Sequence, residues 1–598
     1  MASSAKRKTK PTRQATYRSW ETTDQDEIKL RQKRAADEAM RIKAITPSTH
    51  PFTDYQVTRQ TGTERSTYTV ELRSLKERIN TCTCPDFRKN GLGTCKHIEA
   101  VLNKQTSSRQ RGIASPLVEV YMAREPSYRA AVLLPASRRL KAIGFMSQYL
   151  DAMGQFKSPW ETTLLVMLDD LERATPAVRK AVRISREVLE EADAIGRKQR
   201  LTAARDTLAK QLRDPQTAPA IVRHKLYDYQ QAGMLHLAFT GRAMLADEMG
   251  LGKTVQAIAA CKLLHDLEGI KRVLIVCPAS LKTEWEEQIR KFTHLPTKLV
   301  YGSKPDRQNI YQNTEAFFVV TNYEQILQDL SDINTALCPD VVILDEAQRI
   351  KNWQTKTAQS IKQLAAPYAF VLTGTPLENR IDEIYSLTEF IDRHVFGSLF
   401  RFNRDFYTFD DRGRVSGLKN MRQLHERLHP IMLRRRKDQI ADQLPQRVDN
   451  NYFVKMSPSQ QERYDELQQP VASMVSIAKR RPLSPKEMER LQRMLGCMRM
   501  LCDSAYVLDQ ETKVAPKIDE LLSILDDIWT DQPERKVIVF SEWERMLYLL
   551  AQALENEQLD YAWHTGSVAQ HKRRDEINRF KTTRPTNCSS PPTRAQQA

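Results

Sequence analysis

The middle of the chain alternates short apolar runs with longer segments of helical periodicity. Five of these runs have the length of a buried strand, and each ends in a cluster of glycine or polar residues. The runs end at Leu245, Cys277, Val320, Leu344 and Leu372. Strands that alternate with helices form a parallel sheet with helices on both faces. The pattern therefore predicts the α/β fold class for this region.

The segments that precede the sheet have other patterns. Residues 1–48 are polar and basic at first, which predicts a disordered tail, and a helical stretch is expected over 26–42. Between residues 50 and 105, Tyr68, Val70 and Leu72 alternate with polar residues and predict a strand. This part of the chain is expected to be a small separate module.

Residues 106–210 have a mostly helical pattern, with charged and apolar residues alternating at helical spacing from 177 onward. Four basic residues there would share a helix face, and a solvated face is a simpler interpretation than a binding surface. They are Arg179, Lys180, Arg183 and Arg186. No candidate chemistry is found in this region.

The charge balance bears on the partner. The 598 residues include 92 Lys and Arg against 74 Asp and Glu, a net charge of +18. This excess favours a polyanionic partner such as nucleic acid, with a solvated surface as the alternative. No apolar run is long enough to cross a membrane, and residues 1–20 lack the apolar segment of a secretory signal. We expect a monomeric cytoplasmic protein, associated with the nucleoid and without membrane contact.

Three cysteines and a histidine cluster within sixteen residues of the small module. The order is Cys82-Thr-Cys84, then Cys95-Lys-His97. Three thiolates and an imidazole form a closed tetrahedral set that suits structural Zn²⁺. Core cysteines beside a surface histidine are the alternative, but four such ligands at this spacing are rare by chance. Because no open ligand position is evident, we expect zinc to serve structure and recognition rather than catalysis.

A glycine-bearing loop follows the first apolar run and precedes a helical pattern. Loops of this kind bind phosphates through backbone amides and a helix N-terminus, while the lysine reaches the outer phosphates and the hydroxyl ligates Mg²⁺. The first glycine of the usual spacing is replaced by Asp247, so a coincidental turn is the alternative. The loop residues predicted to contact nucleotide are Asp247, Glu248, Met249, Gly250, Leu251, Gly252, Lys253 and Thr254.

Polar residues at the ends of the other strands support a nucleotide site. Parallel strands end at one edge of a sheet, and ligands bind there. Asp345 could hold Mg²⁺ together with Thr254, and Glu346 could orient and deprotonate an attacking water. Gln230, upstream of the loop, could recognise an adenine edge, and Gln348 completes the predicted nucleotide contacts. The predicted catalytic residues are Lys253, Asp345 and Glu346.

These motifs resemble Swi/Snf-type ATPases of helicase superfamily two over about residues 225–581. The resemblance rests on residues 247–254, on 345–348 and on Leu372-Thr-Gly-Thr-Pro-Leu-Glu-Asn379, and that family also carries Asp in place of the first loop glycine. Residues 432–438 and 444–445 resemble the segment between the two motor lobes. The Cys-x-Cys…Cys-x-His order resembles the SWIM zinc finger.

The resemblance implies a function. Two RecA-like lobes would bind ATP with Mg²⁺ and track along double-stranded DNA through backbone contacts, with residues 278–281 and 321–323 facing the duplex. The chain would be a DNA-dependent ATPase and double-stranded DNA translocase that remodels protein–DNA complexes. The zinc finger could serve a protein partner. The rival interpretation is a non-catalytic protein that binds ATP, zinc and nucleic acid.

The patterns and the resemblance together divide the chain into seven segments. We expect a RecA-like P-loop lobe, part of a second RecA-like lobe, a small N-terminal zinc module and a helical linker. The boundaries are 1–48 for the tail, 49–110 for the zinc finger, 111–210 for the helical linker, 211–395 for the first lobe, 396–515 for a helical insertion and lobe linker, 516–581 for the second lobe and 582–598 for an aberrant tail.

The second lobe is expected to be incomplete. Residues 536–541 and 564–567 resemble its opening, but the family's later Gln-x-x-x-Arg-x-x-Arg motif does not follow. The arginine of that motif accelerates hydrolysis by roughly a thousandfold or more, so hydrolysis is expected to be impaired. We interpret the tail as a frameshift product. If the codons of residues 588–598 are read in a shifted frame, they permit the sequence Phe-Phe-Ser-Thr-Asp-Ala-Gly-Ser-Thr-Gly, which is a segment typical of the family. A natural stop after an unrelated tail is the alternative.

Overall fold

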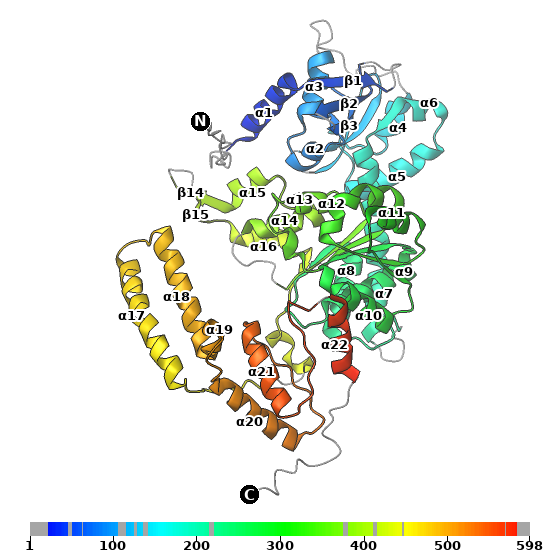
Figure 1. Ribbon diagram of the computed structural model, residues 1–598. Coiled ribbons are helices and arrows are strands. Elements are labelled where there is room, and N and C mark those ends of the chain that lie inside the picture. Colours follow the sequence, from blue (N-terminus) through cyan, green and yellow to red (C-terminus); the bar gives the residue numbers. More distant parts are fainter. Residues whose placement is uncertain are drawn as a thin grey trace. The chain divides into compact units, whose positions relative to one another are not determined.

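The computed structural model in Figure 1 divides into two compact units, Met1–Pro445 and Gln446–Ala598. None of its described helices is both long enough and apolar enough to cross a bilayer. The disordered tail was expected over 1–48: residues 1–21 and 46–48 lie outside the described residues, whereas 22–45 form a helix and a strand, which corrects that part of the prediction. The tail expected over 582–598 lies outside the described residues from 583 onward. The structure describes residues 22–45, 51–61, 64–105, 115–124, 128–135, 141–213, 220–374, 381–410, 415–444, 448–568 and 570–582.

A seven-stranded parallel sheet forms the centre of the larger unit, in the order β10-β11-β9-β12-β13-β8-β16. The sheet confirms the predicted α/β class, and each of the five predicted strands is formed. Its strands are β8 (Arg242–Leu245), β9 (Val273–Cys277), β10 (Thr297–Leu299), β11 (Phe318–Asn322), β12 (Val341–Leu344), β13 (Tyr368–Leu372) and β16 (Met432–Leu433). The short strand β16 comes from the segment that the sequence placed in the helical insertion.

Helices cover both faces of this sheet (Figure 1). Successive side chains of a strand point to opposite faces, so Leu274 and Val276 of β9 join one apolar core while Val273 and Ile275 join another. The first core includes residues of α11 (Lys304–Asn313), α12 (Tyr323–Asp332), α13 (Lys356–Ile361) and α14 (Ile381–Ile391). The second includes residues of α8 (Asp228–Thr240), α9 (Lys253–Glu268) and α10 (Lys282–Phe292).

The N-terminal module is a four-stranded sheet with three short helices. Its strands are β1 (Met40–Ala44), β2 (Asp54–Thr61), β3 (Glu64–Glu71) and β4 (Thr81–Cys82), and its helices are α1 (Asp24–Asp37), α2 (Pro85–Asn90) and α3 (Lys96–Gln105). The strand predicted around Tyr68 is confirmed as β3. The helix expected over 26–42 instead ends at Asp37, because Met40, Ile42 and Ala44 have the alternating burial of a strand and pack on the module's core.

The region expected to be a helical linker contains a second small sheet, which corrects that prediction. Strands β5 (Val118–Ala123), β6 (Arg129–Leu133) and β7 (Val182–Ile184) pair in the order β6-β5-β7. Val118, Val120 and Met122 alternate and are buried, a period of two that a helical interpretation overlooks. The helices are α4 (Lys141–Ser147), α5 (Trp160–Arg173), α6 (Pro176–Ala181) and α7 (Arg186–Arg213).

The four basic residues expected on one helix face lie on three different elements. Arg183 belongs to β7, not to a helix, and its guanidinium donates to the buried Glu119 carboxylate at 3.0 Å. It also donates to the backbone carbonyls of Phe52 and Leu72 in the N-terminal module, at 3.0 and 2.8 Å. Burial raises the pKa of Glu119, and the charges of Arg183 and Arg73 act against that rise. Arg183 therefore joins the two small sheets.

The rest of the larger unit follows α14. Helix α15 (Leu399–Phe406) leads into the antiparallel pair β14 (Tyr407–Phe409) and β15 (Val415–Leu418), and α16 (Met421–Leu428) then leads into β16. Two short 3₁₀ helices, η3 (Ala279–Leu281) and η5 (Ala347–Ile350), follow β9 and β12, and a third, η6 (Asp438–Gln443), closes the unit.

Helices are the regular elements of the smaller unit within its described residues. Its elements are α17 (Pro458–Arg480), α18 (Pro485–Asp503), α19 (Tyr506–Asp509), α20 (Pro516–Asp531), α21 (Glu544–Asn556) and α22 (Gln570–Thr582). The apolar run that resembles the opening of a second lobe, residues 536–541, has no regular secondary structure, and Phe540 is 89% exposed. A strand needs neighbours to be stable, so a second RecA-like sheet is not formed within the described part.

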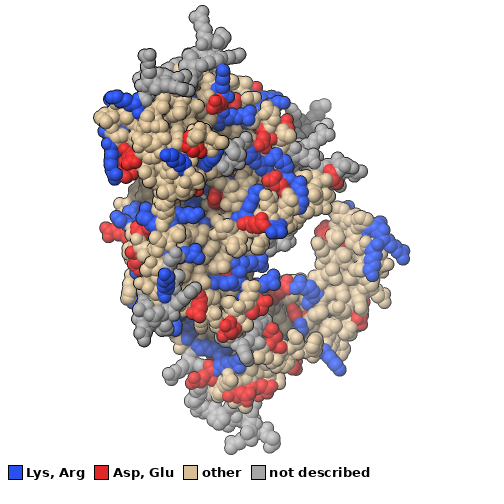
Figure 2. Space-filling model, turned by 180° about the vertical axis from the view of Figure 1, so that it is seen from behind, with Lys and Arg blue, Asp and Glu red and all other residues tan. Residues whose placement is uncertain are grey.

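Charged side chains are distributed widely over the surface. Figure 2 shows Lys and Arg over most of the visible face, with Asp and Glu interspersed among them. Many of the basic residues form ion pairs, such as Lys262 with Asp266 and Arg481 with Glu487. On this face the basic side chains are therefore scattered among acidic ones rather than gathered in one patch.

Replacing Arg183 tests the contact between the two small sheets. We expect Arg183→Ala to lower the free energy of unfolding by about 3 kcal/mol, because the buried Glu119 carboxylate loses a partner. The measurement is denaturant unfolding followed by far-UV circular dichroism. Arg186→Ala is the control, since that side chain is 70% exposed and its loss should change stability by about 0.5 kcal/mol or less. Equal effects of the two variants would contradict this account.

Candidate nucleotide and metal sites

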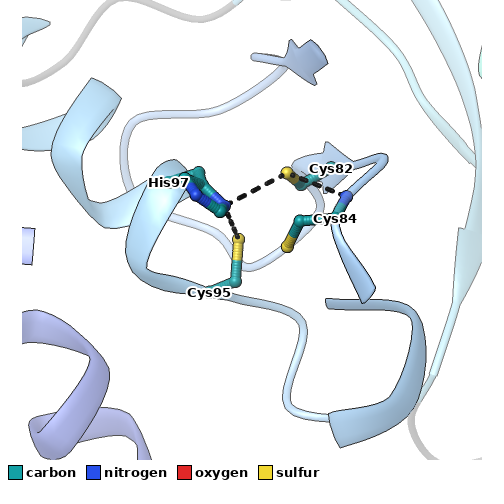
Figure 3. A group of neighbouring side chains, drawn as sticks. All are labelled: Cys82, Cys84, Cys95 and His97. Carbon is teal, nitrogen blue, oxygen red and sulfur yellow. Dashed lines mark hydrogen bonds between the residues drawn. The ribbon is translucent and has the colours of Figure 1, made fainter. Parts of the chain in front are cut away.

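The four predicted zinc ligands come together in the N-terminal module. Cys82 ends β4, and Cys84 caps α2 by accepting a hydrogen bond from the Phe87 amide at 3.3 Å. Cys95 precedes α3, and His97 lies in the first turn of that helix. All four are buried, and their side chains point toward one another (Figure 3).

The geometry fits a tetrahedral zinc ion. All four ligand atoms lie within 4.8 Å of one another, and His97 Nδ1 is 3.9 Å from the sulfurs of both Cys82 and Cys95. A tetrahedron with Zn–S bonds of about 2.3 Å places its ligand atoms about 3.8 Å apart. Hydrogen bonds from the Cys82 and Cys95 thiols lower the pKa of the Cys84 thiol, so the cluster already favours a thiolate. The residues present therefore suit Zn²⁺, with His97 binding through Nδ1.

The predicted phosphate loop lies between β8 and α9. Gly250 and Gly252 have φ angles of +87° and +70°, which side chains rarely adopt, and α9 begins at Lys253. The Lys253 ammonium donates to the Asp247 carbonyl at 2.9 Å. Burial lowers the pKa of Lys253, and the carboxylates of Glu346, Asp247 and Asp345 act in the opposite direction. Thr254 follows on the first turn of α9 and is half-buried.

The residues of the phosphate loop differ in how far they are exposed to solvent. The side chains of Glu248 and Met249 and the backbone at Gly250 are exposed, whereas Leu251 is buried beneath the loop. Asp247 is also fully buried, and it faces Arg435 and Gln256 rather than the outside of the loop. Asp247 is therefore placed to shape the loop from beneath.

The carboxylates of the Asp-Glu-Ala-Gln box lie at the carboxyl end of β12. Asp345 is buried and accepts hydrogen bonds from Trp285 Nε1 at 2.8 Å and from the Glu346 amide at 3.0 Å. Burial raises the pKa of Asp345 to about 6. Glu346 has a φ of +49°, and its carboxylate accepts from Gln348 Nε2 at 2.6 Å. The Thr373 hydroxyl, at the end of β13, lies 3.4 Å from Gln348 Oε1.

Two further motifs lie against the loop. A Cβ on Gly252 would come within 2.7 Å of Gln230 Nε2, so the predicted adenine-reading glutamine touches the phosphate loop. A Cβ on Gly374 would lie 2.9 Å from Met249 Cγ and 3.7 Å from Lys253 Nζ. The remainder of the Thr-Gly-Thr-Pro motif, residues 375–379, lies outside the described residues. The structure thus brings the predicted site residues of the first lobe to one edge of the sheet.

The two segments expected to face DNA differ in what they expose. Ala279 and Ser280 are exposed at the end of β9. Thr321 and Tyr323 are buried instead, and the Tyr323 hydroxyl donates to the Asp345 carbonyl at 2.8 Å. The expectation for 321–323 is therefore corrected: of these three residues, only Asn322 has a partly exposed side chain.

Comparison with known protein families finds two matches. The model of the SNF2-related domain matches residues 229–506, and that of the SWIM zinc finger matches residues 64–105. The chain carries an SNF2-related domain preceded by a SWIM zinc finger. The first match contains the phosphate loop and the Asp-Glu-Ala-Gln box, and the second contains all four zinc-ligand candidates.

Individual relatives are similar over the same region. The putative ATP-dependent helicase/translocase YwqA of Bacillus subtilis is 27% identical over 63% of this chain and 41% of its own length. The ISWI chromatin-remodeling complex ATPase CHR17 of Arabidopsis thaliana is 28% identical over 61% of this chain and 35% of its own length. The chain thus spans less than half the length of each relative.

Among solved structures, a Sulfolobus solfataricus SWI2/SNF2 ATPase core in complex with dsDNA aligns with 60% of this chain and 76% of its own. The identity is 24% and the TM-score is 0.35.

Three residues contribute to the site of the SNF2-related domain in roles that the sequence did not predict. Trp285 and Tyr323 hold Asp345 by its side chain and backbone, and Arg435 contacts Asp247 across a long stretch of sequence. A buried Trp or Tyr needs a hydrogen-bond partner for its polar atom. The sequence could therefore indicate that the two aromatic residues make such bonds, but not that their partner is Asp345. Arg435 lies in a run of basic residues, and the sequence does not indicate which arginine of that run contacts Asp247.

Metal analysis tests the SWIM zinc site. The purified chain is expected to contain about one zinc per molecule, and His97→Ala or Cys95→Ser should reduce that content because each removes one of four ligands. Cys497→Ser is the matched control, since Cys497 lies outside the cluster, and it should leave the zinc content unchanged. Full zinc retention in the Cys95→Ser variant would show that the ligand set is wrong.

Proposed function

We propose that this chain is a nucleotide-dependent motor protein that acts on double-stranded DNA, a DNA-dependent ATPase and translocase of the Swi/Snf type. The observation that carries the proposal is the meeting of two motifs at one sheet edge. The phosphate loop after β8 and the Asp345-Glu346 pair after β12 lie close enough for both carboxylates to act on the Lys253 ammonium. That arrangement serves phosphoryl transfer, which needs positioning and charge neutralisation above all.

The loop would bind the phosphates of ATP. Its backbone amides and the N-terminus of α9 form an anion-binding end, and Lys253 is held there by carbonyl oxygens that a phosphate would replace. Gln230 lies beside Gly252, where its amide could recognise the adenine. The exposed Glu248 and Met249 and the buried Leu251 complete the loop that carries these groups.

The carboxylates would serve the transfer step. Asp345 and the Thr254 hydroxyl are the groups that would hold Mg²⁺, which supplies charge neutralisation on the phosphates when bound. Glu346 is the base that would orient the attacking water and accept its proton. Gln348 holds the Glu346 carboxylate by a 2.6 Å hydrogen bond, and Thr373 lies within reach of Gln348. Glu346 is thereby oriented by residues that follow two neighbouring strands, β12 and β13.

Duplex DNA is the partner that the motor would act on. The chain has a net charge of +18, and contacts with phosphates dominate the affinity of such proteins for DNA. The exposed residues Ala279 and Ser280 and the partly exposed Asn322 stand at the carboxyl ends of β9 and β11. They are the groups of the first lobe proposed to face the DNA backbone.

The secondary structure of the smaller unit favours the alternative function, a non-catalytic protein that binds ATP, zinc and nucleic acid. The described part of the smaller unit contains no strand, whereas a RecA-like second lobe closes the cleft of such motors. ATP turnover measured with and without linear duplex DNA separates the two functions. Turnover that duplex DNA stimulates supports the motor, and nucleotide binding without turnover supports the binding protein.

Nucleotide binding itself is tested at Lys253. We expect Lys253→Ala to weaken retention of a labelled, non-hydrolysable ATP analogue by about tenfold or more, because the loop loses its cation for the outer phosphates. Lys262→Ala on the same helix is the matched control, since that lysine pairs with Asp266 at the surface. Analogue binding that is equal in both variants would place the nucleotide elsewhere.

A further inference from the structure

Asp247 stands where a phosphate loop ordinarily has glycine, and its surroundings show what the change requires. The carboxylate is fully buried. It accepts from the Arg435 amide at 3.1 Å, from Arg435 Nε at 3.0 Å and from Gln256 Nε2 at 3.2 Å, and Arg435 Nη2 forms an ion pair with its second oxygen. Every contact with Arg435 joins residues far apart in the sequence.

Arg435 is itself held by three parts of the first lobe. Its guanidinium donates to the Tyr229 carbonyl and to Gln256 Oε1, the latter at 2.8 Å, and lies 5.5 Å from the centre of the Tyr229 ring. Gly233 makes room for this arrangement: a Cβ there would lie 1.7 Å from Gln256 Oε1 and 2.8 Å from Arg435 Nη2. The arginine therefore joins α8, the loop and α9.

The backbone around Arg435 is paired with the loop as well. The Ala246 amide donates to the Leu433 carbonyl at 2.7 Å, and the Glu248 amide donates to the Arg435 carbonyl at 3.0 Å. The Lys437 amide in turn donates to the Glu248 carboxylate at 2.8 Å. The segment after β16 thus runs along the first half of the loop and continues the pairing of β16 with β8.

The charges of Asp247 and Arg435 explain why their contact matters for a loop that binds phosphates. A buried carboxylate beneath a loop that binds phosphates would repel the anion if it had no counter-charge, and burying it alone is unfavourable. A bidentate guanidinium neutralises the carboxylate and sets its direction, which a lysine ammonium cannot do to the same degree.

We propose that Arg435 is a positioning residue for the nucleotide site, holding the phosphate loop in its binding shape and cancelling the charge of Asp247. This inference rests on the proposed function, because it assumes that the loop binds nucleotide. If Arg435 has this role, the shape of the loop depends on the segment after β16, which leads to the end of the larger unit at residue 445. A glycine at 247 would not need this arginine.

A double-mutant cycle on the full chain tests the proposal, with equilibrium binding of the labelled ATP analogue as the readout. We expect Arg435→Ala to weaken analogue binding by about tenfold, within the usual range of coupling between sites. The double variant Asp247→Gly with Arg435→Ala should recover binding to within about threefold of the unchanged chain, because no unpaired carboxylate remains. Arg435→Lys should fall between the unchanged chain and Arg435→Ala.

Controls separate this mechanism from general loss of structure. Arg436→Ala removes the neighbouring exposed arginine and should leave binding unchanged. Amide hydrogen exchange without nucleotide should rise in residues 246–252 of Arg435→Ala and remain low in the double variant. If Arg435→Ala does not fold, Arg435→Lys and the double variant carry the comparison. Additive effects of the two substitutions on binding, or an unchanged affinity in Arg435→Ala, would overturn the proposal. Failure of the unchanged chain to bind analogue would refute the proposed function instead, while the exchange measurement would still report on the Arg435–Asp247 contact.

Discussion

The parallel direction of the strands in the large sheet is the constraint on which the site depends. Because β8, β9, β11, β12 and β13 run the same way, their carboxyl ends meet at one edge. Each strand ends in, or is followed by, a polar residue at that edge: Lys253, Ser280, Asn322, Asp345 and Thr373. Residues as far apart in the sequence as Lys253 and Thr373 are thereby brought to the same edge of the sheet.

The zinc module is small, and a small domain has little apolar surface to bury on folding. The ligand Cys84 is also the cap of α2, so closure of the metal site and the start of that helix depend on one side chain. The same helix carries Lys89, which pairs with Glu389 of α14 at 2.8 Å, and Glu389 also pairs with the buried Lys362 at 2.5 Å. A residue that would hold zinc therefore also fixes the start of a helix through which the module contacts the first lobe.

Strand positions and the candidate ligands were predictable from the sequence because both follow from local pattern. Runs such as Val273–Cys277 are apolar throughout, as strands covered on both faces must be, and four zinc ligands within sixteen residues need no knowledge of the fold. The small sheet around Val118 was missed because the alternation of Val118, Val120 and Met122 was included in a region interpreted as helical. Arg435 could not be predicted, because three arginines stand side by side from 434 to 436 and only the folded chain buries one against Asp247.

Buried charge recurs where distant segments of the larger unit dock, and the pattern is informative. Arg183 meets Glu119 between the small sheets, Glu389 meets Lys362 beside the zinc module, and Arg435 meets Asp247 beneath the loop. Such pairs add little net stability, since desolvation offsets most of the attraction. Removing one partner is strongly unfavourable, however, so each pair penalises any docking that separates its members. We interpret them as determinants of register: apolar packing alone would tolerate small slips between these segments, and the ion pairs do not.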